Sequence, residues 1–234
     1  MHYDFKQKLN KLDSNQNRSL LVPEIDWKLN EAIEVFVKLV ASPRVISNLG
    51  FEINQRSIDD IRTLVVPSKE LELVSSDNNE YKFRIPSDYS HFIKAEAIGS
   101  KEGCSIKPSL QCVVRQHDDK FLTDSFSKPS FEWREVPITF SEGNIVVYAD
   151  DSFSIDSFRI HYIKKHSYIH NAQDYPGGRY KLPDGTLLIG KQDCELPEIT
   201  HREIVDIAVL ITSGDLSLAD VQTKSNKIQI NKLN

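Results

Sequence analysis

Residues 71–85 read Leu71-Glu-Leu-Val-Ser-Ser-Asp-Asn-Asn-Glu-Tyr-Lys-Phe-Arg-Ile85. Apolar and polar residues alternate in Leu71–Leu73 and again in Tyr81–Ile85, which is the period of a half-buried strand. The polar run Ser75–Asn79 between them is typical of a turn. The stretch therefore predicts a β-hairpin, and it marks the point where a helical pattern gives way to strands.

Two helices are predicted before this hairpin. The first extends from Pro23 to Ala41, with Glu24 and Asp26 near its positive end, where carboxylates are favoured. A second begins at Ser57, which can cap it, and ends at Pro67. The apolar stripe of the first helix consists of Ile25, Leu29, Ala32, Ile33, Phe36 and Val40, and that of the second of Ile58, Ile61, Leu64 and Val65. Residues 1–67 are therefore expected to form an N-terminal helical part.

Strands dominate the chain after the hairpin. We expect a second hairpin closed by Ser141–Asn144, a single helical turn within 118–126, and a loop over 175–186 that is rich in turn-forming residues. Further strands are predicted over 93–98, 110–116, 131–140, 144–148, 158–163 and 187–189. Residues 68–193 are thus expected to form an antiparallel β-rich insertion.

The pattern returns to helix near the C-terminus. Pro197 begins the helix and Gly214 stands where a C′ glycine is expected, with Ile204, Ile207, Ala208 and Ile211 on the apolar face. Residues 194–216 are expected to complete a helical bundle with the N-terminal helices, followed by a basic tail over 217–234. The predicted class is α+β, and successive strands without intervening helices disfavour a doubly wound parallel sheet.

Composition excludes several classes of protein. The 234 residues are 39% hydrophobic and 27% charged, which is typical of a globular chain and not of a disordered one. The net charge of −5 provides no global attraction to nucleic acid or anionic lipid. The first residues have no apolar run that would make a secretory signal, so the chain is expected to stay in the cytosol that produces it. No segment is apolar enough to cross a bilayer.

Cysteine and glycine usage gives no cofactor motif. Cys104, Cys112 and Cys194 form no Cys-x-x-Cys pair, which argues against a disulfide framework and a structural zinc site, and they are expected to be reduced. The pair Gly177-Gly178 lacks the spacing of a phosphate-binding loop and is interpreted as a plain loop. We expect no cofactor.

Three groups of polar residues are candidates for catalytic or metal sites. His161, His166 and His170 could hold a metal, but strand alternation separates the first two, and exposed polar positions explain them better. His201 with Glu203 and Asp206 suggests acid–base chemistry, yet all three fit the solvent side of a helix start. The acidic pairs Asp118-Asp119 and Asp150-Asp151 could bind Mg²⁺, but each adjoins a predicted turn, where aspartate is common. No enzyme is indicated.

Two groups of apolar residues are candidates for contact surfaces. Phe131, Trp133, Phe140 and Tyr148 lie on predicted strands in a mildly acidic region, which favours core packing over stacking on bases. On the first long helix, Trp27, Val35 and Leu39 widen the apolar surface beyond one stripe, so that this helix is expected to contact several neighbours, in a bundle interior or at a subunit interface.

The last residues form a basic segment with alternating apolar positions. Its predicted docking residues are Lys224, Lys227, Ile228, Ile230 and Leu233. Such a segment can add as a strand to a neighbour or lie in a partner's groove, and a frayed terminus explains it equally well.

Four segments, in order along most of the chain, resemble the head–tail connector, adaptor or ring proteins of short-tailed bacteriophages, in particular those of crAss-like phages. These segments are Glu24–Ala32 leading to Phe36–Lys38, Pro86–Tyr89, Val114–Asp119 with Phe126–Trp133, and Cys194–Ala208. The resemblance is one of pattern, and none of the segments is a chemical motif.

The resemblance implies a non-enzymatic structural protein of the virion, assembled in the host cytoplasm. Its copies would form a dodecameric ring that joins the portal vertex to the tail, contacting the portal protein and other tail ring or hub proteins, while DNA passes through the bore without sequence-specific binding. It also implies a bundle from both chain ends, a β-rich insertion and a docking C-terminal tail. A neutral or acidic body is compatible with a DNA channel, because each lysine or arginine contact adds affinity for phosphate.

Two other functions stay open. A tail- or baseplate-associated module that binds host glycans would use the strand-rich middle and its aromatic residues, with an exposed Trp133 and tyrosines in a shallow groove. A metal-dependent hydrolase would use the acidic pairs or the histidine cluster.

Overall fold

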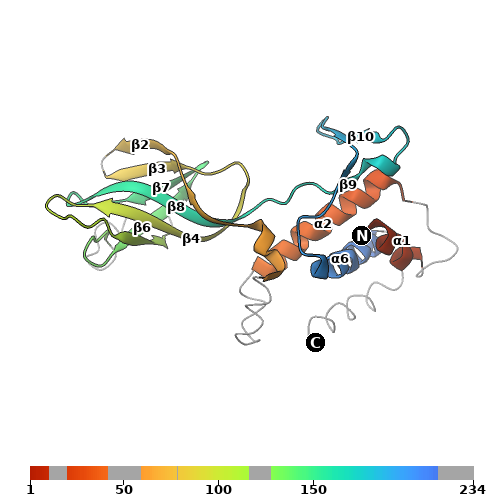
Figure 1. The fold of residues 1–234 in the computed structure, drawn as a ribbon, viewed down its shortest axis with the longest axis horizontal. Helices are drawn as coiled ribbons and strands as arrows, with labels where there is room; N and C mark the ends of the chain where they lie inside the picture. Colours follow the sequence, from red (N-terminus) through yellow and green to blue (C-terminus); the bar gives the residue numbers. More distant parts are fainter. Residues whose placement is uncertain (11–19, 42–58, 78, 116–127, 216–234) are drawn as a thin grey trace, which may run out of the picture. The chain divides into compact units, whose positions relative to one another are not determined.

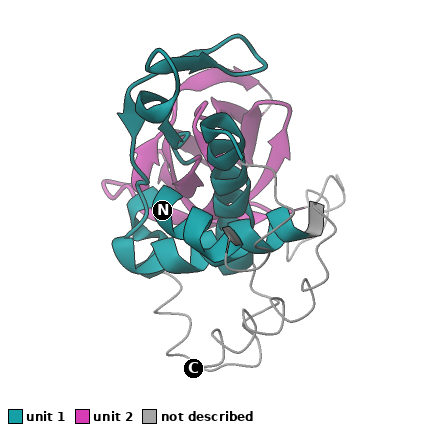
Figure 2. Cartoon of the chain, turned by 90° about the vertical axis from the view of Figure 1, so that its right-hand side faces the viewer, with its two compact units in different colours: residues 1–64, 166–234 teal, residues 65–165 magenta. Residues whose placement is uncertain are grey.

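The computed structural model describes residues 1–10, 20–41, 59–77, 79–115 and 128–215 (Figure 1). The chain divides into two compact units, one formed by residues 1–64 with 166–234 and the other by residues 65–165 (Figure 2). The fold is a mixture of helices and a large sheet, so the predicted α+β class is correct. The predicted insertion ran from 68 to 193, whereas residues 166–193 group with the helices.

Unit 1 brings together helices from the two ends of the chain. Helix α6 contacts both α1 and α2. Unit 1 also holds two small two-stranded sheets, so that the predicted helical bundle is correct only in part. Its elements are α1 (His2–Asn10), α2 (Val22–Ala41), η1 (Arg62–Leu64), β9 (His170–Asn171), η2 (Ala172–Asp174), β10 (Arg179–Lys181), β11 (Leu187–Ile189), β12 (Lys191–Gln192), η3 (Glu198–Thr200) and α6 (His201–Asp215).

The bounds of the predicted helices agree with the structure to different degrees. Helix α2 agrees with the prediction to within a residue, and its predicted stripe is buried except for a half-buried Val40. The helix predicted from Ser57 is described only over 59–64, and Val65, Val66 and Pro67 lie in strand β1 instead. Proline is compatible with an edge strand, because it removes only a backbone donor that the edge does not use. Helix α6 extends through Gly214, which therefore is not its C′ residue.

Unit 2 is one eight-stranded sheet in the order β1-β8-β4-β5-β6-β7-β3-β2. Both predicted hairpins are confirmed, although Ser75–Asp77 belong to strand β2 and not to the turn. The strands are β1 (Val65–Glu70), β2 (Leu73–Asp77), β3 (Glu80–Arg84), β4 (Tyr89–Ser100), β5 (Ser109–Val114), β6 (Glu135–Ser141), β7 (Asn144–Tyr148) and β8 (Ser154–Lys164).

One pair in this sheet corrects the prediction of a purely antiparallel arrangement. Strands β5 and β6 pair in parallel, with Gln111 opposite Glu135 and Val114 opposite Ile138. A parallel pair needs a crossover connection between its strands, and residues 116–127 of that connection lie outside the described part of the chain. The helical turn predicted over 118–126 lies outside the described residues.

The sheet curls so that its two edge strands follow one another in the chain. Only Leu71 and Glu72 separate β1 from β2, which stand at opposite ends of the strand order. The Leu71 N–H donates to the Phe158 carbonyl on β8, and the Arg84 N–H on β3 donates to the Glu72 carbonyl. One continuous stretch thus pairs with both sides of the sheet and closes it around an apolar core. The fully buried members of that core are Ala97, Leu110, Val136, Ile138, Ile145, Val147, Phe158 and Ile160.

Candidate interaction site

A buried carboxylate on α2 organises the loop region of unit 1. Asp26 is fully buried, and its Oδ2 accepts hydrogen bonds from the Tyr180 hydroxyl at 2.6 Å and the Asn171 N–H at 3.1 Å. Its Oδ1 lies 2.6 Å from Nε2 of His2 on α1. Because a buried carboxylate is costly unless its oxygens are hydrogen-bonded, these three partners explain how Asp26 is accommodated. Asp26 thereby connects α1, β9 and β10 to α2.

A second buried side chain, one turn along α2, holds the chain just after unit 2. The Asn30 Oδ1 accepts from the Ile169 N–H at 2.8 Å, and its Nδ2 donates to the Ile169 carbonyl at 2.7 Å. His166 Nε2 lies 3.2 Å from the same Oδ1. The amide therefore pairs with an extended backbone as a neighbouring strand would, which fixes the path of residues 166–171 on α2.

The network shifts the pKa values of its neighbours. Burial, together with the hydrogen bond to Asp26, raises the pKa of the Tyr180 hydroxyl. Burial and the charge of Asp26 raise the pKa of Tyr168 to about 12. Burial lowers the pKa of His166, partly offset by Glu34 and Glu195. Each shift favours the neutral form of Tyr180, Tyr168 and His166.

The three histidines do not form a metal site. His161 lies in unit 2, where its Nδ1 accepts from the Ser68 N–H at 3.3 Å, whereas His166 and His170 belong to unit 1. All three are half-buried, so their interpretation as exposed polar residues was wrong. Within the described part of the chain, no three His, Cys, Asp or Glu side chains are placed to hold a metal ion.

The other acidic and basic candidates have structural contacts. Asp206 pairs with Lys8 of α1, and the His201 ring lies 3.0 Å from the Leu196 carbonyl oxygen. Both Asp206 and His201 are half-buried, whereas the sequence placed them on the solvent side of the helix. Asp151 accepts a hydrogen bond from the Asn79 amide, and Asp150 lies in the turn before β8. Asp118 and Asp119 lie outside the described residues. Gly177 and Gly178 have positive φ angles in a loop, as expected.

The predicted contact residues of α2 are not equally accessible. The Trp27 side chain is 52% exposed, whereas Val35 and Leu39 are half-buried. Trp27 is therefore the apolar residue of this helix that is most available to a partner. The predicted tail residues Lys224, Lys227, Ile228, Ile230 and Leu233 lie outside the described part of the chain.

Trp133 corrects the interpretation of the aromatic residues as core. Phe131 and Phe140 pack against the core of unit 2, but Trp133 lies in a turn before β6 and is 85% exposed. The turn is well defined: Ser130 and Glu135 exchange backbone hydrogen bonds, and the Trp133 N–H donates to the Ser130 hydroxyl. The position of Glu132 in the same turn is held by an ion pair with Lys101.

The cysteines are free thiols, as expected. Burial raises the pKa of Cys112 to about 12 and also raises that of Cys194, which makes both poor nucleophiles. No helix in the described ranges has the length and apolar character needed to span a bilayer.

Sequence reasoning missed one structured surface, the β10–β11 hairpin. Its sequence is rich in turn-forming residues and predicts a loop followed by a strand over Leu187–Ile189, whereas the structure also has a strand over Arg179–Lys181. A signal was present in Arg179-Tyr-Lys181, where polar and aromatic residues alternate over three positions. The hairpin is held to α2 through the hydrogen bond from Tyr180 to Asp26.

No family model matches the chain, and no curated protein matches it significantly.

Proposed function

We propose that the chain is a non-enzymatic structural subunit of a ring that connects the portal vertex of a tailed bacteriophage to its tail. The observation that supports this most is that α1, α2 and α6, which come from both ends of the chain, pack together. The sheet of residues 65–165 is inserted between α2 and α6 in the sequence. This arrangement agrees with the organisation that the family resemblance implies. In the proposed ring the copies are twelve, and DNA passes through the bore without specific contacts.

Exposed apolar residues on the helices support a role in assembly. Trp27 on α2 and Tyr3 on α1 both lie largely in solvent. Large aromatic side chains contribute most to protein interfaces when they are buried by a partner. A structural subunit would bury such residues against the portal protein, a tail protein or a second copy.

Native mass spectrometry tests the proposal, with the protein alone and mixed with portal and tail ring proteins. We expect a closed oligomer, either alone or on a portal ring, and weaker assembly of Trp27→Asp than of Lys38→Gln, an exposed control on the same helix. A protein that stays monomeric with every virion partner would contradict the proposal.

A second candidate function, glycan binding, is favoured by one observation. Trp133 is 85% exposed on an ordered turn, and a flat indole can stack on the apolar face of a sugar ring. A glycan array with the wild-type protein and Trp133→Ala tests it: sugar binding that the substitution abolishes would support this function in place of the ring.

A third candidate, a metal-dependent hydrolase, has weaker support. His166 is engaged with Asn30, and the described ranges hold no cluster of three metal-binding side chains. Asp118→Asn and Asp119→Asn variants that retain every activity of the wild-type protein would remove its basis.

A further inference from the structure

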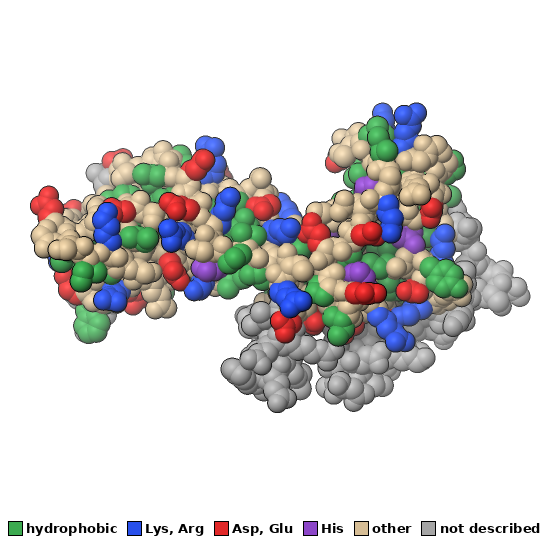
Figure 3. All heavy atoms as spheres, viewed as in Figure 1, with side chains coloured by type: hydrophobic (Ala, Val, Ile, Leu, Met, Phe, Trp, Pro, Cys, Tyr) green, Lys and Arg blue, Asp and Glu red, His purple; other side chains and the backbone are tan. Residues whose placement is uncertain are grey.

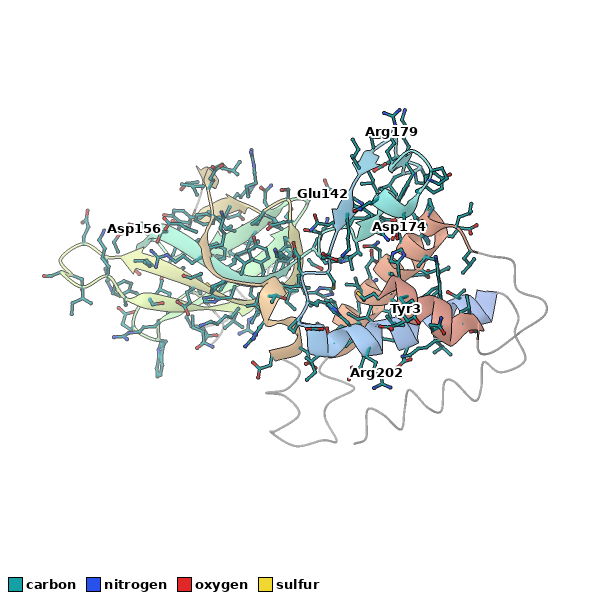
Figure 4. The ribbon with its side chains drawn as sticks, turned by 45° about the vertical axis from the view of Figure 1, so that its right-hand side comes forward. Tyr3, Glu142, Asp156, Asp174, Arg179 and Arg202 are labelled. Atoms are coloured by element: carbon teal, nitrogen blue, oxygen red, sulfur yellow. The ribbon has the colours of Figure 1, made fainter. Side chains whose placement is uncertain are left out.

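The β10–β11 hairpin presents an outward face that combines cationic and aliphatic side chains. Arg179 pairs directly with Ile189, and Lys181 with Leu187, so that these four residues lie on one face of the hairpin. All four are exposed, with Leu187 at 44% and Ile189 at 66%, whereas Tyr180 on the other face is buried. Figure 4 shows Arg179 directed away from the rest of unit 1. Figure 3 shows basic and hydrophobic side chains together on the protrusion that carries β10.

This face is held rigidly from behind. The Tyr180 hydroxyl donates to the buried Asp26, and the Tyr175 ring packs edge-on against the Tyr180 ring with centroids 5.8 Å apart. At the tip, the Leu182 N–H donates to the Thr186 carbonyl at 2.9 Å, and Gly185 adopts a φ of 88° that the tight turn requires. A preorganised surface loses little conformational entropy when it binds.

Strand β2 of unit 2 presents the complementary chemistry. Leu73 and Val74 are 52% and 48% exposed, at a point where the pairing of β2 with β3 shifts its register, so the described residues leave about half of each side chain in solvent. Glu72 and Asp77 flank this apolar pair and are exposed. Within the described sheet, β2 pairs with β3 alone, so its other edge is open. An open edge with exposed apolar residues is a site that proteins normally cover.

We infer that the hairpin face of one copy, formed by Arg179, Lys181, Leu187 and Ile189, docks on the β2 edge of the next copy, formed by Glu72, Leu73, Val74 and Asp77. In the described part of the chain none of the four charged residues has an ion-pair partner, and the two surfaces carry opposite charge around aliphatic centres. Residues 65–165 contain 16 Asp and Glu against 13 Lys and Arg, so the wider surface of unit 2 also attracts a cationic face.

The contact rests on the proposed function and gives it a specific form. Two different surfaces meet, so the contact is heterologous, and repeating it from copy to copy generates a ring when the rotation closes. An isologous dimer would instead use the same surface twice. The inferred contact therefore belongs to the class of interface that a connector ring needs.

Charge reversal tests the pairing by analytical ultracentrifugation. In a chain carrying both Arg179→Glu and Lys181→Glu, we expect self-association to weaken by at least about tenfold. Adding Glu72→Lys and Asp77→Lys to that chain should restore it to within a few-fold of the wild-type value. If circular dichroism shows that both variants are folded and the variant with all four substitutions does not regain self-association, the pairing is overturned.

A mixing experiment tests the heterologous geometry. Ile189→Asp removes the hairpin face and Val74→Asp removes the β2 face, so each variant alone should stay monomeric. Mixed together, they should form a 1:1 dimer that grows no further, because only one intact contact remains. The controls are Ile199→Asp in unit 1 and Ile106→Asp in unit 2, two isoleucines outside both surfaces that are 75% and 74% exposed, and both variants should assemble like the wild type.

The remaining outcomes separate this inference from the proposed function. A ring that persists in both Ile189→Asp and Val74→Asp would overturn the contact and leave the connector function intact. If the wild-type chain shows no self-association at concentrations up to about 1 mM, the contact is also overturned, because a dissociation constant above that value means a binding free energy weaker than roughly 4 kcal/mol. Assembly of the chain on portal protein would then still test the proposed function. The wild-type chain can also be tested for binding to anionic lipid vesicles and to duplex DNA. If it binds one of them without self-associating, and Arg179→Glu abolishes the binding, the hairpin face belongs to that partner and the inferred contact is overturned.

Discussion

Asp26 lies in the first turns of α2, where the helix dipole favours a carboxylate. From the sequence alone, this explains the residue without any further role. The structure gives it a different role, as the fully buried acceptor for Tyr180 and the Asn171 N–H. The side chain therefore contributes to stability through tertiary hydrogen bonds that come from residues more than 140 positions away.

Replacing Tyr180 by Phe removes the hydroxyl that donates to Asp26 and leaves a buried carboxylate oxygen with one donor fewer. We expect Tyr180→Phe to lower the free energy of unfolding by about 2 kcal/mol, since hydrogen bonds to charged groups contribute roughly 1.5–3 kcal/mol. Urea denaturation measures the change. Tyr175→Phe, on the same segment, is the control and should stay within about 0.5 kcal/mol of the wild type. Equal stabilities of the two variants would contradict the role of this hydrogen bond.

His166 should make stability depend on pH. Burial lowers its pKa in the folded protein, whereas an unfolded histidine titrates near about 6.5. The unfolded chain then binds more protons, so the stabilisation is fully present above about pH 6.5 and is lost as the pH falls from there toward the lower folded pKa. Urea unfolding at about pH 7.5 and about pH 5.5 should show a larger loss for the wild type than for His166→Gln, which keeps a donor for Asn30. Identical losses would contradict the shift.

At the scale of elements, α1 shows how tertiary contacts stabilise a short helix that the sequence pattern does not predict. Its nine residues are few for an isolated helix, but Phe5 and Leu9 are buried, and Lys8 pairs with Asp206 of α6. The apolar positions are too few to give a recognisable period. Packing against α6 and α2 supplies the stabilisation that propensity lacks.

Truncating Phe5 tests this dependence. Phe5→Ala removes a fully buried aromatic ring and should lower the free energy of unfolding by about 3–5 kcal/mol. Tyr3→Ala, on the same helix but 73% exposed, should change it by less than about 0.5 kcal/mol. Chemical denaturation followed by circular dichroism compares the two. A Phe5→Ala variant as stable as Tyr3→Ala would show that α1 does not depend on this packing.

At the scale of the whole molecule, the sheet of residues 65–165 is a continuous segment with its own core. Its ends lie side by side, because Val65 pairs with Ile163 across β1 and β8. A segment with adjacent ends and an internal core can be inserted into a host chain without disturbing it. The helical unit, in contrast, needs both ends of the chain.

This difference predicts the behaviour of fragments. A fragment of residues 65–165 should fold alone into a β-rich unit with one cooperative thermal transition, which circular dichroism would detect. A fragment of residues 1–64 should lack stable structure, because α6 is missing from its core. An unfolded 65–165 fragment would show that its core requires the rest of the chain.

The sequence by itself determined the α+β class, helix α2 and most strands, because these follow from local periodicity of apolar residues. It also placed helix α6 to within a few residues at its start. The exposure of Trp133 and the strand β10 were not predicted, because a single aromatic residue in a turn has no period and three alternating residues are too few to distinguish a strand from a turn-rich loop.

Only the tertiary structure decided how distant segments pair. The parallel alignment of β5 with β6, the closure of the sheet through Leu71 and Glu72, and the convergence of His2, Asn171 and Tyr180 on Asp26 all join residues far apart in sequence. Such contacts depend on which surfaces remain to be buried once the local elements have formed. Local propensity has no information about that choice, so it emerges only when the whole chain packs.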